Sequence, residues 1–259
     1  MSLEPAFEQW MAALEERHLA DLTFKQVSGA LRALSSAYVE RRGRLAEGAA
    51  LEGAGKRAAF ALFYGPLHYL LVRSIVRSLP QAAADTTPTL LDLGCGTGAS
   101  GAAWAVARRT APRVIGIDRH QWAVAEAALT YRHFGLTART RQDDIAGAAW
   151  PTGPISMLAA FTLNELSEVA REAVLTRAVE RVRQARAAKS GERLCVLVVE
   201  PLAGFVAPWW GRWRAVIEAA GGRADEWRVR VELPAIVAKL DRASGLNHRE
   251  LTGRSLWLS

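Results

Sequence analysis

The sequence predicts an α/β fold with a parallel sheet covered by helices on both faces. From about residue 89 onward, apolar runs of strand length alternate with segments of helical periodicity, as in strand–helix–strand units. Several of these runs are apolar throughout rather than at every second position, as expected of strands buried on both faces. Half of the 259 residues are hydrophobic, which is ample for a sizeable core.

Residues 1–84 are predicted to form a helical extension or lid, and residues 85–259 a cofactor-binding domain. Apolar residues recur at helical spacing after Pro5 and again after Phe24, which predicts two helices. A longer helix is expected over residues 57–79. We expect an interruption near Gly65-Pro66, because proline lacks an N–H donor and clashes with the preceding turn.

A polar linker is predicted over residues 80–89, and the regular elements of the second part follow it. The predicted strands are 89–93, 113–117, 137–142, 155–161, 194–199, 227–233 and 254–258. The predicted helices are 99–109, 120–134, 168–188, 205–220 and 234–243.

The first strand runs into a glycine-rich turn between Leu90 and Gly101. After the acidic Asp92, three glycines stand at alternate positions, Gly94, Gly96 and Gly98. A glycine has no Cβ, so a ligand can approach the backbone amides of the turn and of the following helix. The stretch therefore predicts a loop that binds a nucleotide-type cofactor.

Three acids decide which cofactor the loop favours. Asp92 lies inside the turn, where it would repel a pyrophosphate but hold an ammonium group. Asp118 ends the next strand and could accept both ribose hydroxyls, and Asp144 follows the third strand and could accept from an adenine amino group. These acids favour S-adenosylmethionine (SAM), which carries a sulfonium and an ammonium. A dinucleotide, whose glycine spacing also fits, and a fold without a cofactor are the alternatives.

Three motifs resemble those of class I SAM-dependent methyltransferases. Residues 92–98 resemble the first motif of that family, Gly116-Ile117-Asp118 the second and Asp143-Asp144-Ile145 the third. The resemblance covers roughly residues 88–259. It implies a Rossmann-like, seven-stranded, mostly parallel sheet with an antiparallel last strand. The expected cofactor-binding residues are Asp92, Gly94, Cys95, Gly96, Gly98, Asp118, Arg119, Asp144, Ile145 and Asn164.

Shorter motifs resemble the ribosomal small-subunit methyltransferase-like family of mitochondria and bacteria. They are Leu163-Asn164-Glu165-Leu166, Val199-Glu200-Pro201 and Arg254-Ser255-Leu256-Trp257, after an all-helical leader. This resemblance implies association with ribosomal RNA or assembling ribosomes. Members of that family often carry a cysteine cluster for an iron–sulfur centre. This chain has only Cys95 and Cys195, so such a cluster is excluded and no metal site is predicted.

Catalytic candidates lie where the sheet should present a ligand, beyond the carboxyl ends of its strands. Asn164 and Glu165 follow the fourth strand, where Asn164 could accept a hydrogen bond from a target amine or hydroxyl and Glu165 could act as a base. His248 lies in the connection before the last strand, and imidazole titrates near neutrality. The alternatives are a helix entry without chemistry and an ordinary loop histidine.

The candidate substrate residues are mostly aromatic. Tyr64 and His68 flank the Gly65-Pro66 break and could reach over the cofactor, Trp209 could stack on a flat substrate, and Arg249 follows His248. For these aromatic side chains, core packing is the alternative.

Charge leaves the methyl acceptor open. The net charge of +7 favours RNA or a ribosomal subunit, and residues 168–188 carry five arginines on one predicted face, but the cations are spread along the chain. A small-molecule acceptor and a SAM-binding assembly factor without turnover are the alternatives. We expect no membrane partner, because no apolar run reaches bilayer length. Isolated cysteines and no export signal predict a cytoplasmic protein. The sequence leaves the oligomeric state open.

Overall fold

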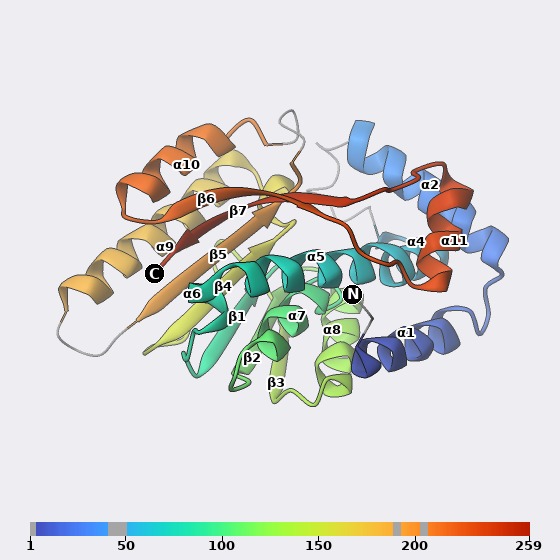
Figure 1. Ribbon diagram of the computed structural model, residues 1–259, viewed down its shortest axis with the longest axis horizontal. Coiled ribbons are helices and arrows are strands. Elements are labelled where there is room, and N and C mark those ends of the chain that lie inside the picture. Colours follow the sequence, from blue (N-terminus) through green and yellow to red (C-terminus); the bar gives the residue numbers. More distant parts are fainter. Residues whose placement is uncertain (1–3, 41–50, 189–192, 203–206) are drawn as a thin grey trace.

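The computed structural model describes residues 4–40, 51–188, 193–202 and 207–259. At its centre is a seven-stranded sheet in the order β3-β2-β1-β4-β5-β7-β6 (Figure 1). The strands are β1 (Thr89–Leu93), β2 (Arg113–Asp118), β3 (Ala138–Gln142), β4 (Ile155–Ala160), β5 (Leu194–Glu200), β6 (Arg223–Val229) and β7 (Leu251–Leu258). Strands β1 to β5 pair in parallel, and β7 is antiparallel to both β5 and β6. The predicted Rossmann-like fold class is confirmed.

Helices cover both faces of this sheet. Helices α5 (Gly65–Ser78), α7 (Ala99–Ala107) and α8 (Gln121–His133) lie on one face, and α9 (Glu168–Ala187) and α10 (Trp210–Ala219) lie on the other (Figure 1). Each face has its own hydrophobic core. Trp104 and Tyr131 belong to the first, and Trp150 and Trp213 to the second.

The helices that precede the sheet pack into the first of these cores. They are α1 (Pro5–His18), α2 (Phe24–Glu40), α4 (Ala54–Ala59) and the π-helical turn Phe60–Tyr64, which we call the π turn and which leads directly into α5. Helix α11 (Ala235–Ser244), between β6 and β7, packs on α2 and on the π turn. Figure 1 shows α2, α4 and α11 grouped at one end of the sheet.

Several predicted elements differ from the structure, and β7 starts three residues earlier than predicted. The helix does not break at Pro66, because this proline lies in the first turn of α5, directly after the π turn, where its missing N–H is tolerated. Strand β6 starts four residues earlier than predicted, directly after Gly221 and Gly222 end α10. The linker contains a short helix, α6 (Pro80–Ala83). Helix α10 starts at Trp210 rather than at 205, and residues 205 and 206 lie outside the described part.

Among the described residues, one helical segment is long and apolar enough to cross a membrane. It is Ala54–Ser78, so the expectation that no apolar stretch reaches this length is wrong. However, 78% of its apolar window is buried inside the protein. Packing in the first core accounts for that apolar character.

Candidate active site

The glycine turn after β1 has backbone conformations that other residues rarely adopt. Gly94, Gly96 and Gly98 have φ angles of 64°, 51° and 77°. A Cβ on Gly94 would overlap the side chain of Thr162, and one on Gly98 would lie 2.9 Å from the Cα of Ala127. Close packing against β4 and α8 therefore requires glycine at both positions.

Asp118, at the carboxyl end of β2, is hydrogen-bonded to the glycine turn. Its Oδ2 accepts from the Gly96 N–H at 2.9 Å, and its Oδ1 accepts from the His120 N–H at 2.8 Å. A carboxylate can accept about four hydrogen bonds, so acceptor capacity remains for two ribose hydroxyls. Asp118 thus fixes the turn and can still bind a ligand.

Asp92 differs from its predicted role. Its side chain is buried, with 1% exposure, and its carboxylate accepts from the Tyr131 hydroxyl at 2.7 Å, beside the start of α7. Burial, together with the negative charge of Asp118, raises the pKa of Asp92 to about 7. In this geometry the Asp92 carboxylate is directed to Tyr131, and its contact with an ammonium group stays a prediction.

Two further carboxyl groups continue this acidic edge beyond β4 and β5. Burial raises the pKa of Glu165 to about 7, although Arg119 lies 3.8 Å away and opposes the shift. Burial also raises the pKa of Glu200 to about 8, in spite of the hydrogen bond from the Leu163 N–H at 2.8 Å. Glu200 was not among the predicted site residues. Its place at the carboxyl end of a buried strand was the available signal.

Asn164 holds this edge together rather than facing an acceptor. Its Nδ2 donates to Glu200, and its Oδ1 accepts from the indole N–H of Trp209 at 3.1 Å. Trp209 is 7% exposed, and the Arg171 guanidinium lies 5.4 Å from its ring centroid. These contacts give Asn164 and Trp209 a structural role, and their roles as an acceptor-binding group and a stacking platform stay predictions.

A group of aromatic rings lies beside the glycine turn. We call Phe60, Phe63, Tyr64, His68 and Phe161 the aromatic cluster. The ring of Phe60 would lie 3.5 Å from a Cβ on Gly96, and Phe60, Tyr64 and His68 have ring centroids about 6 Å apart. The structure thus brings the predicted residues Tyr64 and His68 to the cofactor loop.

His68 and Phe161 form the tightest pair of this cluster. Their rings stack with centroids 3.8 Å apart and planes 12° apart. Burial lowers the pKa of His68 to about 3, so its imidazole is neutral. Phe161 directly follows β4 and has a φ of 59°, which is strained for a bulky residue and is often found at functional sites. No local pattern in the sequence indicates Phe60 or Phe161.

The remaining predicted residues lie in the glycine turn, in the loop after β3 and in the connection before β7. Cys95 is buried in the glycine turn, and its N–H donates to Ile117 O. Asp144 is exposed after β3 and caps the Ala146 N–H at 3.1 Å, while Ile145 is buried in the second core. His248 and Arg249 lie on the exposed connection between α11 and β7.

The site's residues fit SAM. The glycine turn has the left-handed conformations that expose backbone amides, and Asp118 offers acceptors at its edge. Asp92, Asp118, Glu165 and Glu200 lie along this edge and neighbouring pairs of them interact electrostatically, so a ligand with two positive charges would favour their ionised forms. Within the described ranges no group of histidine, cysteine and acidic residues could hold a metal ion.

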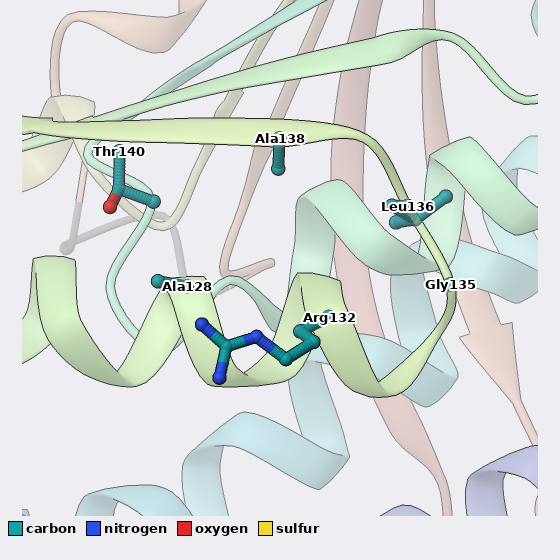
Figure 2. A pocket seen from close by; sticks show the side chains of 6 residues that line it. All are labelled: Ala128, Arg132, Gly135, Leu136, Ala138 and Thr140. Atoms are coloured by element: carbon teal, nitrogen blue, oxygen red, sulfur yellow. The ribbon is translucent and has the colours of Figure 1, made fainter.

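A separate cavity of about 340 Å³ lies between α8 and β3 (Figure 2). Ala138 and Thr140 of β3 face Ala128 and Arg132 of α8 across it, and Gly135 and Leu136 complete its lining. It contains no residue of the glycine turn or the aromatic cluster. It is therefore not part of the candidate active site.

Comparisons with known proteins agree with this assignment. Residues 90–185 match the family model described as a methyltransferase domain. A search of curated proteins gives no match. The fold resembles a SAM-dependent methyltransferase from Aquifex aeolicus, at 16% identity over 75% of this chain and 93% of that one, with a TM-score of 0.46. It also resembles the plantazolicin methyltransferase BpumL, at 11% identity over 95% of this chain and 99% of that one, with a TM-score of 0.47.

A candidate RNA methyltransferase from Pyrococcus horikoshii is similar at 14% identity over 73% of this chain and 81% of that one, with a TM-score of 0.43. Likenesses at this level carry no argument about the methyl acceptor. The domain match and the site together identify SAM as the cofactor and methyl transfer as the activity.

Proposed function

We propose that this SAM-dependent methyltransferase, whose methyltransferase domain includes residues 90–185, acts on a small planar acceptor. The observation that carries the proposal is the aromatic cluster beside the glycine turn, with the stacked His68–Phe161 pair at the end of β4. Aromatic faces beside a cofactor are suited to orienting a flat ring.

The chain's own residues supply binding and alignment. The bound cofactor supplies a methyl group on a sulfonium, which is reactive enough for direct transfer. The glycine turn and Asp118 hold the adenosyl part, and the charges of Asp92 and Glu165 favour a cation at this edge. The aromatic cluster would hold the acceptor ring in line with the transferred group, and such alignment lowers the entropic part of the barrier.

The arginines of α9 support a small acceptor over RNA. Arg171, Arg177, Arg181 and Arg186 donate to the carbonyl oxygens of Leu166, Ala148, Pro151 and Ser259, at 2.7 to 3.3 Å. These contacts fix neighbouring loops and the end of the chain. The arginine face predicted for an RNA partner is therefore largely engaged in internal contacts.

RNA or a ribosomal component is the second candidate acceptor. The net charge of +7 favours it, as do Arg119, whose side chain is 40% exposed, and the exposed Arg249. Such an acceptor predicts binding that weakens steeply as salt concentration rises.

The test has two stages. Calorimetry with SAM, S-adenosylhomocysteine and NAD should show binding of the first two, and tighter binding of NAD would contradict the cofactor assignment. Transfer of a labelled methyl group to small-molecule extracts, to total RNA and to ribosomal subunits then separates the acceptors. We expect label in the small-molecule fraction, reduced in His68→Leu and unchanged in the matched control His133→Leu. Label in RNA alone would overturn the proposed acceptor, and SAM binding without any transfer would indicate an assembly factor.

A further inference from the structure

Helix α11 ends in a turn that places a histidine against a buried carboxylate. Asp241 lies in the last turn of α11, with a side chain that is 6% exposed. Its Oδ2 accepts from the backbone N–H of His248 at 2.8 Å, and its Oδ1 lies 2.5 Å from the Nδ1 of the same residue. Two contacts from one carboxylate therefore fix both the backbone and the ring of His248.

The chain between these residues is shaped for this contact. Gly245, with a φ of 76°, ends the helix, and Asn247, immediately before the histidine, has a φ of 51°. Asparagine tolerates this left-handed conformation better than most residues, although the conformation still has a higher backbone energy than a right-handed one. A turn with two such residues redirects the chain so that His248 folds back on Asp241.

Within the described part of the chain, no lysine or arginine pairs with Asp241. One oxygen of the carboxylate faces the His248 imidazole and the other accepts from the His248 backbone N–H, so both are directed to this residue. When Nδ1 donates its proton to a carboxylate, Nε2 is left with its lone pair free. The His248 side chain is 35% exposed, and no described residue is hydrogen-bonded to its Nε2, so this nitrogen is accessible to a ligand.

The pair lies at the same edge of the sheet as the glycine turn. Helix α11 packs on the π turn, and the His248 ring is 6.0 Å from the ring of Phe63 in the aromatic cluster. Strand β7 begins three residues after His248, and its Arg254 lies opposite Glu200 in the antiparallel pairing with β5. The cluster therefore connects the histidine to the site.

We propose that His248 removes the proton from the acceptor and that Asp241 is its positioning residue, which makes a hydroxyl group the site of methylation. Nε2 takes the hydroxyl proton while the oxygen bonds to the methyl carbon and the carbon–sulfur bond breaks, leaving S-adenosylhomocysteine. The protonated imidazole then returns its proton to water. A hydroxyl needs this help because it is a poor nucleophile until it loses its proton, whereas a neutral amine attacks first. This inference rests on the proposed function.

The experiment uses the full chain, labelled SAM and a series of phenols from weakly acidic 4-methoxyphenol to strongly acidic 4-nitrophenol. We expect His248→Gln to lower kcat ~100-fold for the weakly acidic phenols and much less for 4-nitrophenol, which ionises without a base. Asp241→Asn should act in the same direction by a smaller factor. SAM affinity should not change in either variant, and His133→Gln should match the wild type throughout.

Each outcome bears on a stated part of the idea. Equal losses for all the phenols would mean that His248 is only structural and would overturn the inference. Wild-type transfer to amines or thiols but to no phenol would overturn the hydroxyl class while leaving the proposed function intact, and label in RNA alone would overturn that function. If Asp241→Asn does not fold, His248→Gln still decides the result through its dependence on phenol acidity.

Discussion

The two edges of the central sheet treat buried carboxyl groups in opposite ways. At the amino edge, Asp85 is ion-paired to Arg108 at 2.6 Å with both side chains fully buried, and the hydroxyls of Thr87 and Ser156 also donate to it. At the carboxyl edge, Asp92 and Glu200 are as deeply buried, yet no ion pair reaches either of them within the described residues.

This difference indicates that the amino edge of the sheet contributes to folding stability, whereas the carboxyl edge is suited to ligand binding. At the amino edge, the charge of Asp85 is neutralised by Arg108 within the folded protein, and its oxygens are already hydrogen-bonded. This carboxylate is therefore not left to bind a ligand. The carboxyl edge leaves Asp92 and Glu200 without an ion pair among the described residues, and burial raises the pKa of both, so a cation bound beside this edge would favour their ionised forms. The following predictions test this contrast, beginning with the largest expected effect.

Arg108→Met should destabilise the protein by about 3–5 kcal/mol, because it leaves the carboxylate of Asp85 buried and unpaired. The free energy of unfolding from urea denaturation measures the loss. The neighbouring exposed Arg109→Met is the matched control and should be nearly neutral. SAM affinity of the folded fraction should stay unchanged, and a large drop in affinity would mean that the two edges are coupled.

Asp118→Ala should weaken SAM binding by about 1–3 kcal/mol, because buried hydroxyl groups of the ligand lose their acceptor. Calorimetric titration with SAM gives the difference. Asp225→Ala, on β6, is the control: it also removes one negative charge, and it should leave SAM affinity unchanged. Unchanged affinity in the Asp118 variant would remove this residue from the cofactor site.

Glu200→Gln should flatten the dependence of stability on pH. The pKa of Glu200 is raised from an ordinary 4.5 to about 8, so the folded state keeps a proton that the unfolded state releases. Its contribution is therefore complete below pH 4.5 and is lost as the pH rises towards 8, at up to about 1.4 kcal/mol per pH unit. Unfolding measured from pH 5 to pH 8 should show a smaller decline in the variant. An unchanged slope would contradict the assignment, and Glu180→Gln on the surface of α9 is the control.

Ser156→Ala should cost about 1 kcal/mol, the smallest effect of the series, because Arg108 and Thr87 continue to satisfy Asp85. Thermal unfolding is sensitive enough to detect it. A loss as large as that of Arg108→Met would mean that the hydroxyl, rather than the ion pair, stabilises this edge.

The fold could be predicted because its determinants are local. Strand β1 and the glycine turn follow from a short apolar run and glycines at fixed spacing, and Asp118 from its place at the end of the next strand. The pairing of β7 between β5 and β6 is a long-range contact, and it was expected only through resemblance to known methyltransferases.

The site was harder to predict from the sequence, because many of its contacts join distant parts of the chain. His68 and Phe161 are 93 positions apart and meet only when α5 packs on the sheet. Trp209 and Asn164 were predicted at the site, but their mutual hydrogen bond makes them supports. The role of Asp241 depends on how a turn folds back, and no spacing rule reveals that.

The π turn determines which neighbours the two halves of the helical segment Ala54–Ser78 contact. An extra residue in one helical turn rotates everything after it by roughly 100° about the axis. Helix α4, before the turn, can therefore face α2, while α5, after it, faces α7, although the helical segment is continuous. Forcing the same residues into a uniform α-helix would rotate one half relative to the other, so either the docking of α2 or the burial of α5 would fail, whereas deleting one residue of the turn, such as Ala61, would leave both halves facing as they do.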